Sequence, residues 1–204
     1  MSSIRTLLEQ RTSVNYFDTQ HPLDEGQIIE LVRLATLSPS AYNFQNWKFL
    51  AVRDPAAKQS LMASAYGQQK VVDAPVTFIV CGTLNAHRHL AQTLQPAVEA
   101  AILDDDVVGT WVSMAQATHE GNPQLQRDEA FRSASLAAMT LMLAAQDQGL
   151  VTGPMSGFDP AAVSREFALA VDEVPVILVT VGYPAEGNWA RKPRRATHDV
   201  LQVV

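Results

Sequence analysis

The sequence predicts an α+β fold in which a small mixed sheet is flanked by helices. The chain has 204 residues, of which 47% are hydrophobic, and this is enough apolar material for one sizeable core or two small lobes. Short segments rich in β-branched and aromatic residues alternate with longer segments of helical spacing. Their order is helix, helix, strand, helix, strand, helices, strand, which is not a regular βα alternation and therefore favours the α+β class.

Two helices are expected before the first strand. Apolar residues recur at helical spacing in residues 4–8, which predicts a short first helix. Asp24 followed by Gln27 resembles a capping box, and a broad apolar face runs onward from Ile28. This second helix should end near Pro39, because proline cannot continue it.

Three strands are expected, over residues 47–52, 76–81 and 174–181. Each segment is short, β-branched or aromatic, and bounded by residues that break regular structure. Between the first two strands, Asp54 and Pro55 supply a cap and a proline at the first helical position, which predicts a helix over residues 56–65.

Three further helices are expected, over residues 92–103, 107–120 and 125–148. Gly121 ends the second of these helices and Gly149 ends the third. The middle of the last helix is apolar nearly all round, so it should lie at the centre of the structure or in a subunit interface.

Composition and charge exclude several classes of function. Fifteen basic against twenty-one acidic residues give a net charge of −6, which disfavours nucleic acid and anionic membranes as partners. The single cysteine, Cys81, cannot form an intramolecular disulfide, a thiolate zinc site or an iron–sulfur cluster. His87 and His89 lack a nearby third ligand, so we expect no metal site. Without a leader-like start or a membrane-spanning apolar run, a cytoplasmic location is expected.

Basic residues gather near both ends of the chain. The C-terminal group comprises Arg191, Lys192, Arg194 and Arg195. Arg11 and Ser13 form a second group at a helix break, where backbone N–H groups are free. Each group alone is compatible with a solvated surface. Guanidinium groups together with hydroxyl groups, however, are typical of a phosphate-binding site.

Two loops carry groups suited to ligand binding. Residues 38–47 form a polar loop in which Asn43 and Gln45, if the segment is extended, project their amides to the same side and could bind a heterocycle edge. Residues 149–158 hold three glycines, which let backbone N–H groups approach a ligand. Ordinary capped turns are the alternative for both. Lys70, just before a strand, is by itself an exposed lysine.

Taken together and in order, these groups resemble the motifs of the FMN-dependent nitroreductase family. That family has an Arg-x-Ser-x-basic-x-Phe motif, a Pro-Ser-Ser-x-Asn-x-Gln-Pro-Trp motif, a lysine before an Asp-Ala pair, a Pro-x-x-Gly-Phe turn and a C-terminal Lys-x-Arg. The corresponding segments here are residues 11–17, 39–47, 70–74, 154–158 and 192–194. The resemblance implies one nitroreductase-like domain over residues 1–204, in an intertwined homodimer with exchanged C-terminal tails.

The resemblance also implies FMN as the cofactor and NAD(P)H as the electron donor. The implied cofactor-binding residues are Arg11, Thr12, Ser13, Asn15, Pro39, Ser40, Ala41, Asn43, Lys70, Pro154, Met155, Ser156, Gly157, Lys192 and Arg194. The two terminal groups would hold the phosphate and ribityl chain, and residues 39–43 would reach the flavin from the other subunit. Lys70 would lie near N1 and O2, and the backbone N–H of Gly157, with Ser156, would face N5.

Three positions depart from the family pattern. Asn15 stands where the family usually has Lys or Arg, so one positive charge near the flavin is missing. Ala41 replaces the second serine, and Ser156 replaces an acidic residue. These departures concern substrate preference more than the cofactor.

The expected activity is a ping-pong transfer of hydride from NAD(P)H through the flavin to a nitroaromatic, quinone or enone. No residue stands out as a general acid, so protons would come from solvent. Other flavin chemistry, such as dehalogenation, flavin fragmentation or ring dehydrogenation, and a non-redox protein that binds flavin or a phosphorylated metabolite are the alternatives. Tyr66, Trp111 and Phe131 could line a substrate pocket or belong to the core.

Overall fold

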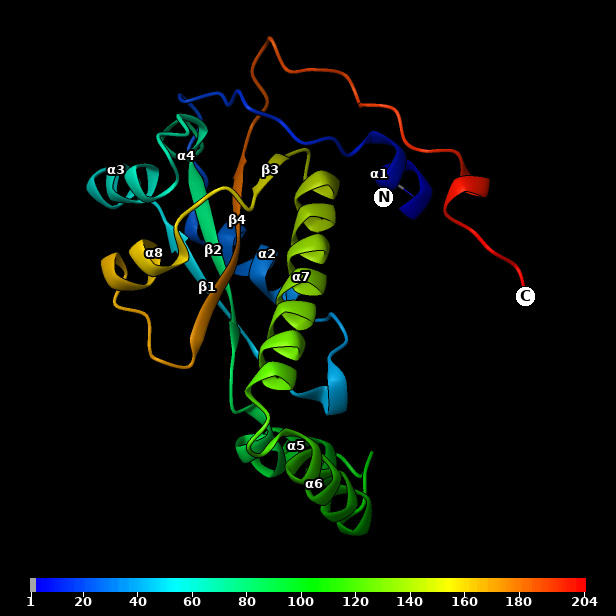
Figure 1. Cartoon of the computed structure of the whole chain (residues 1–204). Helices are drawn as coiled ribbons and strands as arrows, with labels where there is room; N and C mark the ends of the chain where they lie inside the picture. Colours follow the sequence, from blue (N-terminus) through cyan, green and yellow to red (C-terminus); the bar gives the residue numbers. More distant parts are fainter. Residues whose placement is uncertain (1–2) are drawn as a thin grey trace.

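A four-stranded sheet forms the middle layer of the molecule. The computed structural model describes residues 3–204 (Figure 1). The strands are β1 (Trp47–Val52), β2 (Val76–Thr83), β3 (Val151–Met155) and β4 (Glu173–Gly182), in the spatial order β1-β2-β4-β3. All three strand pairs are antiparallel. Within residues 3–204, the one parallel pairing is an isolated bridge between Ser13 and Thr152. The α+β class is confirmed, with a sheet that is antiparallel apart from this bridge.

Eight α-helices surround the sheet in the described part of the chain. They are α1 (Ile4–Gln10), α2 (Glu25–Ala35), α3 (Pro55–Ser64), α4 (Lys70–Asp73), α5 (Leu90–Glu99), α6 (Asp105–His119), α7 (Pro123–Asp147) and α8 (Pro160–Glu166). Aspartates cap four of them, and the Asp24 carboxylate with the Gln27 amide completes the predicted capping box of α2. None of these helices combines the length and the hydrophobicity that a membrane-spanning helix requires.

The two faces of the sheet are covered by different helices. Phe78 and Val80 of β2 belong to the cluster that packs against α2 and α7. Ile79 and Cys81 point to the opposite face and join the cluster formed with α3 and α8. This alternation follows from the period of two along a strand. Both faces of β2 are therefore covered, and the strand is almost entirely apolar.

A third, smaller cluster lies at the far end of α7, where α5 and α6 pack together (Figure 1). Its buried residues are Phe44, Leu90, Leu94 and Ala115. Phe44 comes from the loop that precedes β1. This cluster therefore fixes the loop against the α5–α6 pair.

Four elements differ from the sequence prediction. Strand β3 forms where a glycine-rich loop is expected, because this segment pairs along its whole length with β4. Helix α5 ends at Glu99 rather than near residue 103, and Ala101 behind it has a φ of 54°. Helices α4 and α8 were not predicted. The Asp159-Pro160 start of α8 has the same cap-and-proline pattern as α3 and could have been found.

The C-terminal segment leaves the sheet after β4 and runs past α1, ending away from the sheet (Figure 1). A bridge between Phe17 and Pro184 joins its start to the N-terminal segment. Residues 191–204 are exposed throughout, including the apolar Val203 and Val204.

Candidate functional site

The guanidinium group of Arg11, near the N-terminus, lies close enough to two C-terminal guanidinium groups to be repelled by both. Arg11 follows α1, and Arg191 and Arg194 belong to the C-terminal segment. Burial lowers the pKa of Arg11, and the charges of Arg191 and Arg194 lower it further. Its Nη1 atom is buried and has no hydrogen-bond partner. Among residues 3–204, none of the three pairs with a carboxylate. Such an uncompensated cluster is a candidate binding site for an anion.

Asn188 holds the two ends of the chain together. Its Oδ1 accepts hydrogen bonds from the N–H groups of Asn15 and Tyr16 at 2.8 and 3.0 Å, and its Nδ2 donates to the Tyr16 carbonyl at 2.8 Å. Arg191 donates to the carbonyls of Leu8 and Glu9 in the last turn of α1. Sequence reasoning missed Asn188, because one asparagine in a polar segment has no distinguishing pattern.

A cavity of about 220 Å³ lies at the N-terminal side of β2. Its lining residues are Asn15, Tyr16, Gln68, Gln69, Lys70 and Asp73. Lys70 Nζ donates a hydrogen bond of 3.3 Å to Asn15 Oδ1, and partial burial lowers the pKa of Lys70. Asn15 therefore orients this ammonium group rather than adding a second charge. Lys70 is half-buried, so it is not the freely exposed lysine that its position alone suggests.

Strand β3 brings a turn to the same side of the molecule. Gly153 has no space for a side chain, because an added Cβ would lie 2.5 Å from Thr180 Oγ1 and 2.7 Å from the Val14 carbonyl oxygen. After the strand, Gln68 Nε2 donates to the Gly157 carbonyl at 2.7 Å and so fixes the turn. The Gly157 N–H has no acceptor among residues 3–204. Met155 packs in the core, so it can offer a ligand only its backbone.

The other predicted residues near the two chain ends contact different parts of the chain. Ser13 bridges to Thr152 near the start of β3, and Thr12 is half-buried next to Arg11 in the chain. Lys192 lies over the Trp189 ring, with Nζ 4.7 Å from its centroid. Arg194 Nη1 donates to the Lys192 carbonyl at 2.8 Å.

The predicted residues Pro39, Ser40, Ala41 and Asn43 do not join this group. Their loop precedes β1, whose first residue, Trp47, pairs with Gly82 near the end of β2. Lys70 lies before the first residue of β2, so the two groups lie at opposite ends of that strand. One chain therefore does not bring all the predicted residues together.

The extended conformation assumed for this loop is wrong. Ala41–Asn43 form a 3₁₀ turn, and Tyr42, Asn43 and Gln45 have φ angles of 50°, 58° and 49°. Ser40 Oγ accepts a hydrogen bond of 2.9 Å from the Gln45 N–H. Left-handed backbone at residues other than glycine is strained and is often found at functional sites.

The three aromatic residues suggested for a substrate pocket lie on different elements. Tyr66 follows α3 and is 72% exposed. Trp111 of α6 packs beside Tyr42, with ring centroids 6.4 Å apart, and Phe131 of α7 lies under the Arg127 guanidinium at 4.5 Å. One chain does not gather them into a pocket.

Comparison with known proteins places this geometry in a family. Residues 8–183 match the model of the Nitroreductase family. YodC of Bacillus subtilis, provisionally named an NAD(P)H nitroreductase, is 31% identical over 182 residues, which cover 89% of this chain and 90% of YodC. The crystal structure of Bacillus subtilis YdfN, provisionally described as a nitroreductase, shares 31% identity and superposes with a TM-score of 0.92, covering 98% of both chains.

A second solved structure is a protein from Exiguobacterium sibiricum, provisionally described as a nitroreductase and crystallised in complex with FMN. It shares 24% identity and has a TM-score of 0.91, covering 100% of this chain and 98% of the other. At this identity it supports the fold. Because the family model covers most of the sequence, the chain belongs to the nitroreductase family.

Proposed function

We propose that the protein is a homodimeric, FMN-dependent oxidoreductase that uses NAD(P)H to reduce nitroaromatics, quinones or related electron-poor acceptors in a ping-pong cycle. The observation that carries the proposal is the uncompensated cluster of Arg11, Arg191 and Arg194, which includes a buried, unpartnered guanidinium nitrogen. FMN, when bound, supplies the two-electron chemistry between nicotinamide and acceptor. The names of the relatives support NAD(P)H as the donor.

The residues of the site fit FMN in three respects. The guanidinium cluster matches a phosphate, and the Arg11 Nη1 atom needs an acceptor that the chain itself does not provide. In the cavity that it lines, the Lys70 ammonium group would stabilise negative charge on a bound flavin ring. The Gly157 N–H, held in position by Gln68, is free to donate to a ring nitrogen. The residues of this chain thus bind and orient the cofactor.

A second copy of the chain would complete this site. Pro39, Ser40, Ala41 and Asn43 lie away from Lys70 in one chain, so they can contact the same cofactor only from a partner. An apolar groove of about 390 Å³ between α1, α2 and α7 supports such an assembly. Its apolar lining includes Ile4, Leu7, Leu34, Leu37 and Leu143. The exposed apolar end of the C-terminal segment would pack on the partner as an exchanged tail.

The visible absorption spectrum of the purified protein tests this proposal. The protein should show flavin absorption, lose it on anaerobic addition of NADH or NADPH, and regain it when a quinone is added. A protein that cannot be loaded with FMN would contradict the proposal. A protein that binds FMN but does not react with either nicotinamide would instead be a non-redox flavin-binding protein.

A further inference from the structure

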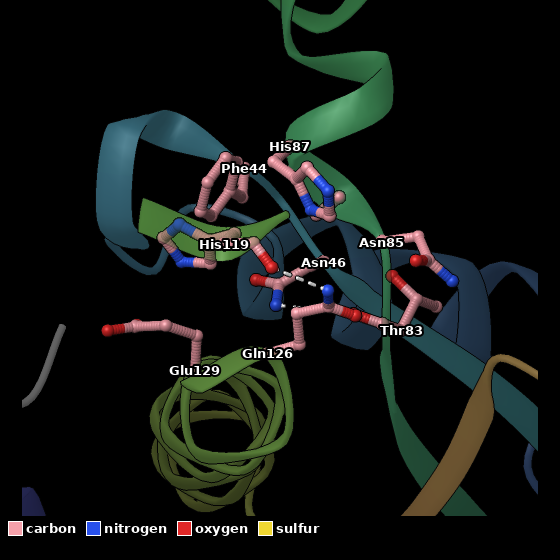
Figure 2. A pocket seen from close by; sticks show the side chains of 9 residues that line it. Phe44, Asn46, Thr83, Asn85, His87, His119, Gln126 and Glu129 are labelled. Atoms are coloured by element: carbon pink, nitrogen blue, oxygen red, sulfur yellow. Dashed lines mark hydrogen bonds between the residues drawn. The ribbon is translucent and has the colours of Figure 1, made fainter. Parts of the chain in front are cut away.

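A buried polar cluster lies between the loop of residues 38–46 and the α5–α6 pair, at the opposite end of β2 from Lys70. Three of its side chains are almost fully buried: His87 is 1% exposed, His119 is 5% exposed and Asn46 is 3% exposed. The two imidazole rings are 5.8 Å apart between centroids and nearly parallel. Figure 2 shows both rings and the Asn46 amide around one small space. His87 lies in the 3₁₀ turn Ala86–His89 that leads into α5.

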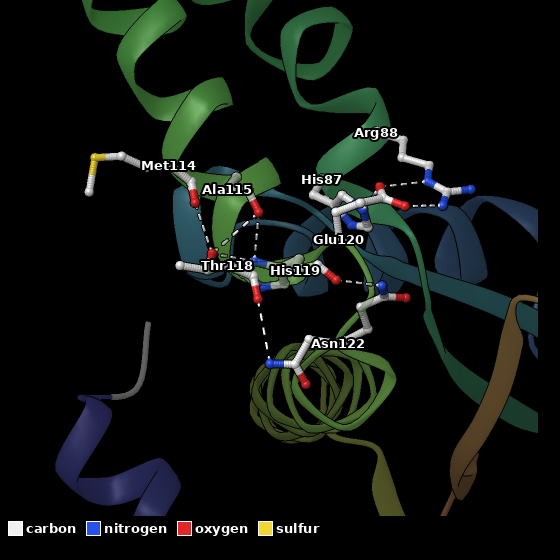
Figure 3. Close-up of polar contacts among 9 residues, drawn as sticks. His87, Arg88, Met114, Ala115, Thr118, His119, Glu120 and Asn122 are labelled. Carbon is white, nitrogen blue, oxygen red and sulfur yellow. Dashed lines mark hydrogen bonds and ion pairs between the residues drawn. The ribbon is translucent and has the colours of Figure 1, made fainter.

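The hydrogen bonds of each imidazole fix which nitrogen carries its proton. His87 Nε2 lies 3.0 Å from Glu120 Oε2, and a carboxylate can only accept, so this nitrogen is the N–H. Arg88 and His87 hold the pKa of Glu120 at about 2, so the carboxylate is ionised. His119 Nδ1 lies 3.0 Å from the Ala115 carbonyl oxygen and 2.8 Å from Thr118 Oγ1 (Figure 3). The Thr118 hydroxyl donates its own proton to the Met114 carbonyl at 2.9 Å, so His119 Nδ1 is the donor to both oxygens. In their neutral forms, His87 Nδ1 and His119 Nε2 are therefore acceptors.

The Asn46 amide adds a third acceptor to the same space. Asn46 Nδ2 donates to the Thr83 carbonyl at 3.4 Å, which leaves Oδ1 as the unpartnered acceptor of this amide. His87 Nδ1, His119 Nε2 and Asn46 Oδ1 are all buried, and none has a hydrogen-bond partner among residues 3–204. All three residues line a cavity of about 10 Å³. This is about the volume that one water molecule needs.

One water molecule cannot satisfy three acceptors, because it donates only two hydrogen bonds. One additional proton completes the set: a protonated imidazole donates to the water oxygen, and the water donates to the other two acceptors. We propose that this cavity binds one water molecule together with one exchangeable proton, and that the completed network is a pH-sensitive clamp that positions the 38–46 loop. His87, His119 and Asn46 are then positioning residues for the cofactor contacts of that loop, a step that rests on the proposed function.

Few charged groups face this cluster. Glu120 and Arg88 neutralise each other beside His87, through hydrogen bonds of 3.2 and 2.6 Å. Glu129 of α7 lines the cavity and pairs with Arg132. Loop residue Phe44 packs on the His119 ring, with centroids 5.2 Å apart, so the imidazole contacts the loop directly. The extra proton therefore enters a site with little net charge around it.

Nuclear magnetic resonance of the full-length protein with ¹⁵N-labelled histidine tests the proton site without any activity. At high pH we expect His87 as the Nε2–H form and His119 as the Nδ1–H form. On acidification, the ¹⁵N chemical shifts of both rings should change together, with one common midpoint.

The Asn46→Leu variant removes one of the three acceptors. One water molecule then satisfies both rings, so the midpoint should move to lower pH. His89→Gln is the control, because His89 is exposed and this substitution should leave the midpoint unchanged. Two independent transitions, or the opposite tautomers, would overturn the proposal.

The affinity of the protein for FMN between pH 5.5 and 8 tests the clamp. Because the FMN phosphate also titrates in this range, the informative quantity is the ratio of wild-type to variant affinity. We expect this ratio, taken against Asn46→Leu and separately against His119→Phe, to rise by about fivefold or more on acidification. A flat ratio would overturn the positioning role. If the wild type bound no FMN, the proposed function would fail, and the resonance measurement would still decide the proton site.

Discussion

At the scale of single residues, charge and burial distinguish side chains suited to bind a ligand from side chains that stabilise the fold. Arg11 lies among like charges with a buried, unpartnered nitrogen, which is unfavourable for the chain alone. Asn188 satisfies four backbone groups and is structural. The sequence predicted Arg11 because it lies in a recognisable motif. It did not predict Asn188 or His119, whose roles depend on contacts between distant segments.

Arg11→Met should separate binding from folding. Loss of a charge-assisted contact should weaken FMN binding by roughly 10- to 100-fold. Because Arg191 and Arg194 repel Arg11, the melting temperature without cofactor should stay the same or rise. Titration with FMN and thermal unfolding measure the two effects, with Arg165→Met on exposed α8 as the control. Unchanged FMN affinity would show that Arg11 does not contact the phosphate.

Cys81 should be inert in the native protein. Burial raises the pKa of its thiol from 9.0 to about 12, so roughly one molecule in 10⁴ holds a thiolate at pH 8. The unfolded chain ionises at lower pH than the native protein. The free energy of unfolding should therefore be unaffected below pH 9 and should decrease as the pH rises from 9 toward 12. Thiol labelling at pH 8 should be slow until urea unfolds the protein, and rapid labelling of the native state would contradict this account.

At the scale of elements, the sequence predicted those whose signal is local. The capping box of α2, the Asp-Pro start of α3 and the apolar length of α7 lie in consecutive residues, and all three helices were found close to their predicted bounds. Strand β3 was missed because Gly153 and Pro154 resemble a turn. The strand exists because β4 pairs with it, and such pairing is not encoded in local periodicity.

Gly153→Ala should test the close packing of β3. The added methyl would lie 2.5 Å from Thr180 Oγ1 of β4 and 2.7 Å from the Val14 carbonyl oxygen. Either β3 or one of these two neighbours must therefore move. We expect the free energy of unfolding to fall by about 1–3 kcal/mol. Gly109→Ala on α6, where no atom lies within 4 Å, is the control and should be stabilising by about 0.5–1 kcal/mol. Urea denaturation measures both, and an equal effect of the two substitutions would contradict the packing described.

At the scale of the whole molecule, the predicted site residues form two groups that one chain does not bring together. The guanidinium cluster, Lys70 and the β3 turn gather at one end of the sheet, and the 38–46 loop lies at the other. The resemblance of the motifs predicted both groups and their division between subunits. Periodicity and composition could not predict that the two groups lie at opposite ends of β2, because this depends on strand pairing between distant segments.

Removal of residues 200–204 should weaken the proposed dimer. The deletion removes four exposed apolar residues, and burial of each is worth about 1.5–3 kcal/mol. We therefore expect the dimer dissociation constant to rise at least about tenfold, as measured by analytical ultracentrifugation. Val171→Ser, which changes a fully exposed valine outside the tail, is the control. An unchanged constant would show that the tail does not pack on a partner.

The affinity of the purified protein for FMN, compared with riboflavin, measures directly what the guanidinium cluster contributes. Riboflavin lacks the phosphate that the cluster is proposed to bind. We predict that FMN binds with one molecule per subunit and at least about 100-fold more tightly than riboflavin, and that this preference largely disappears in Arg11→Met. Equal affinity for the two flavins in the wild type would contradict the account.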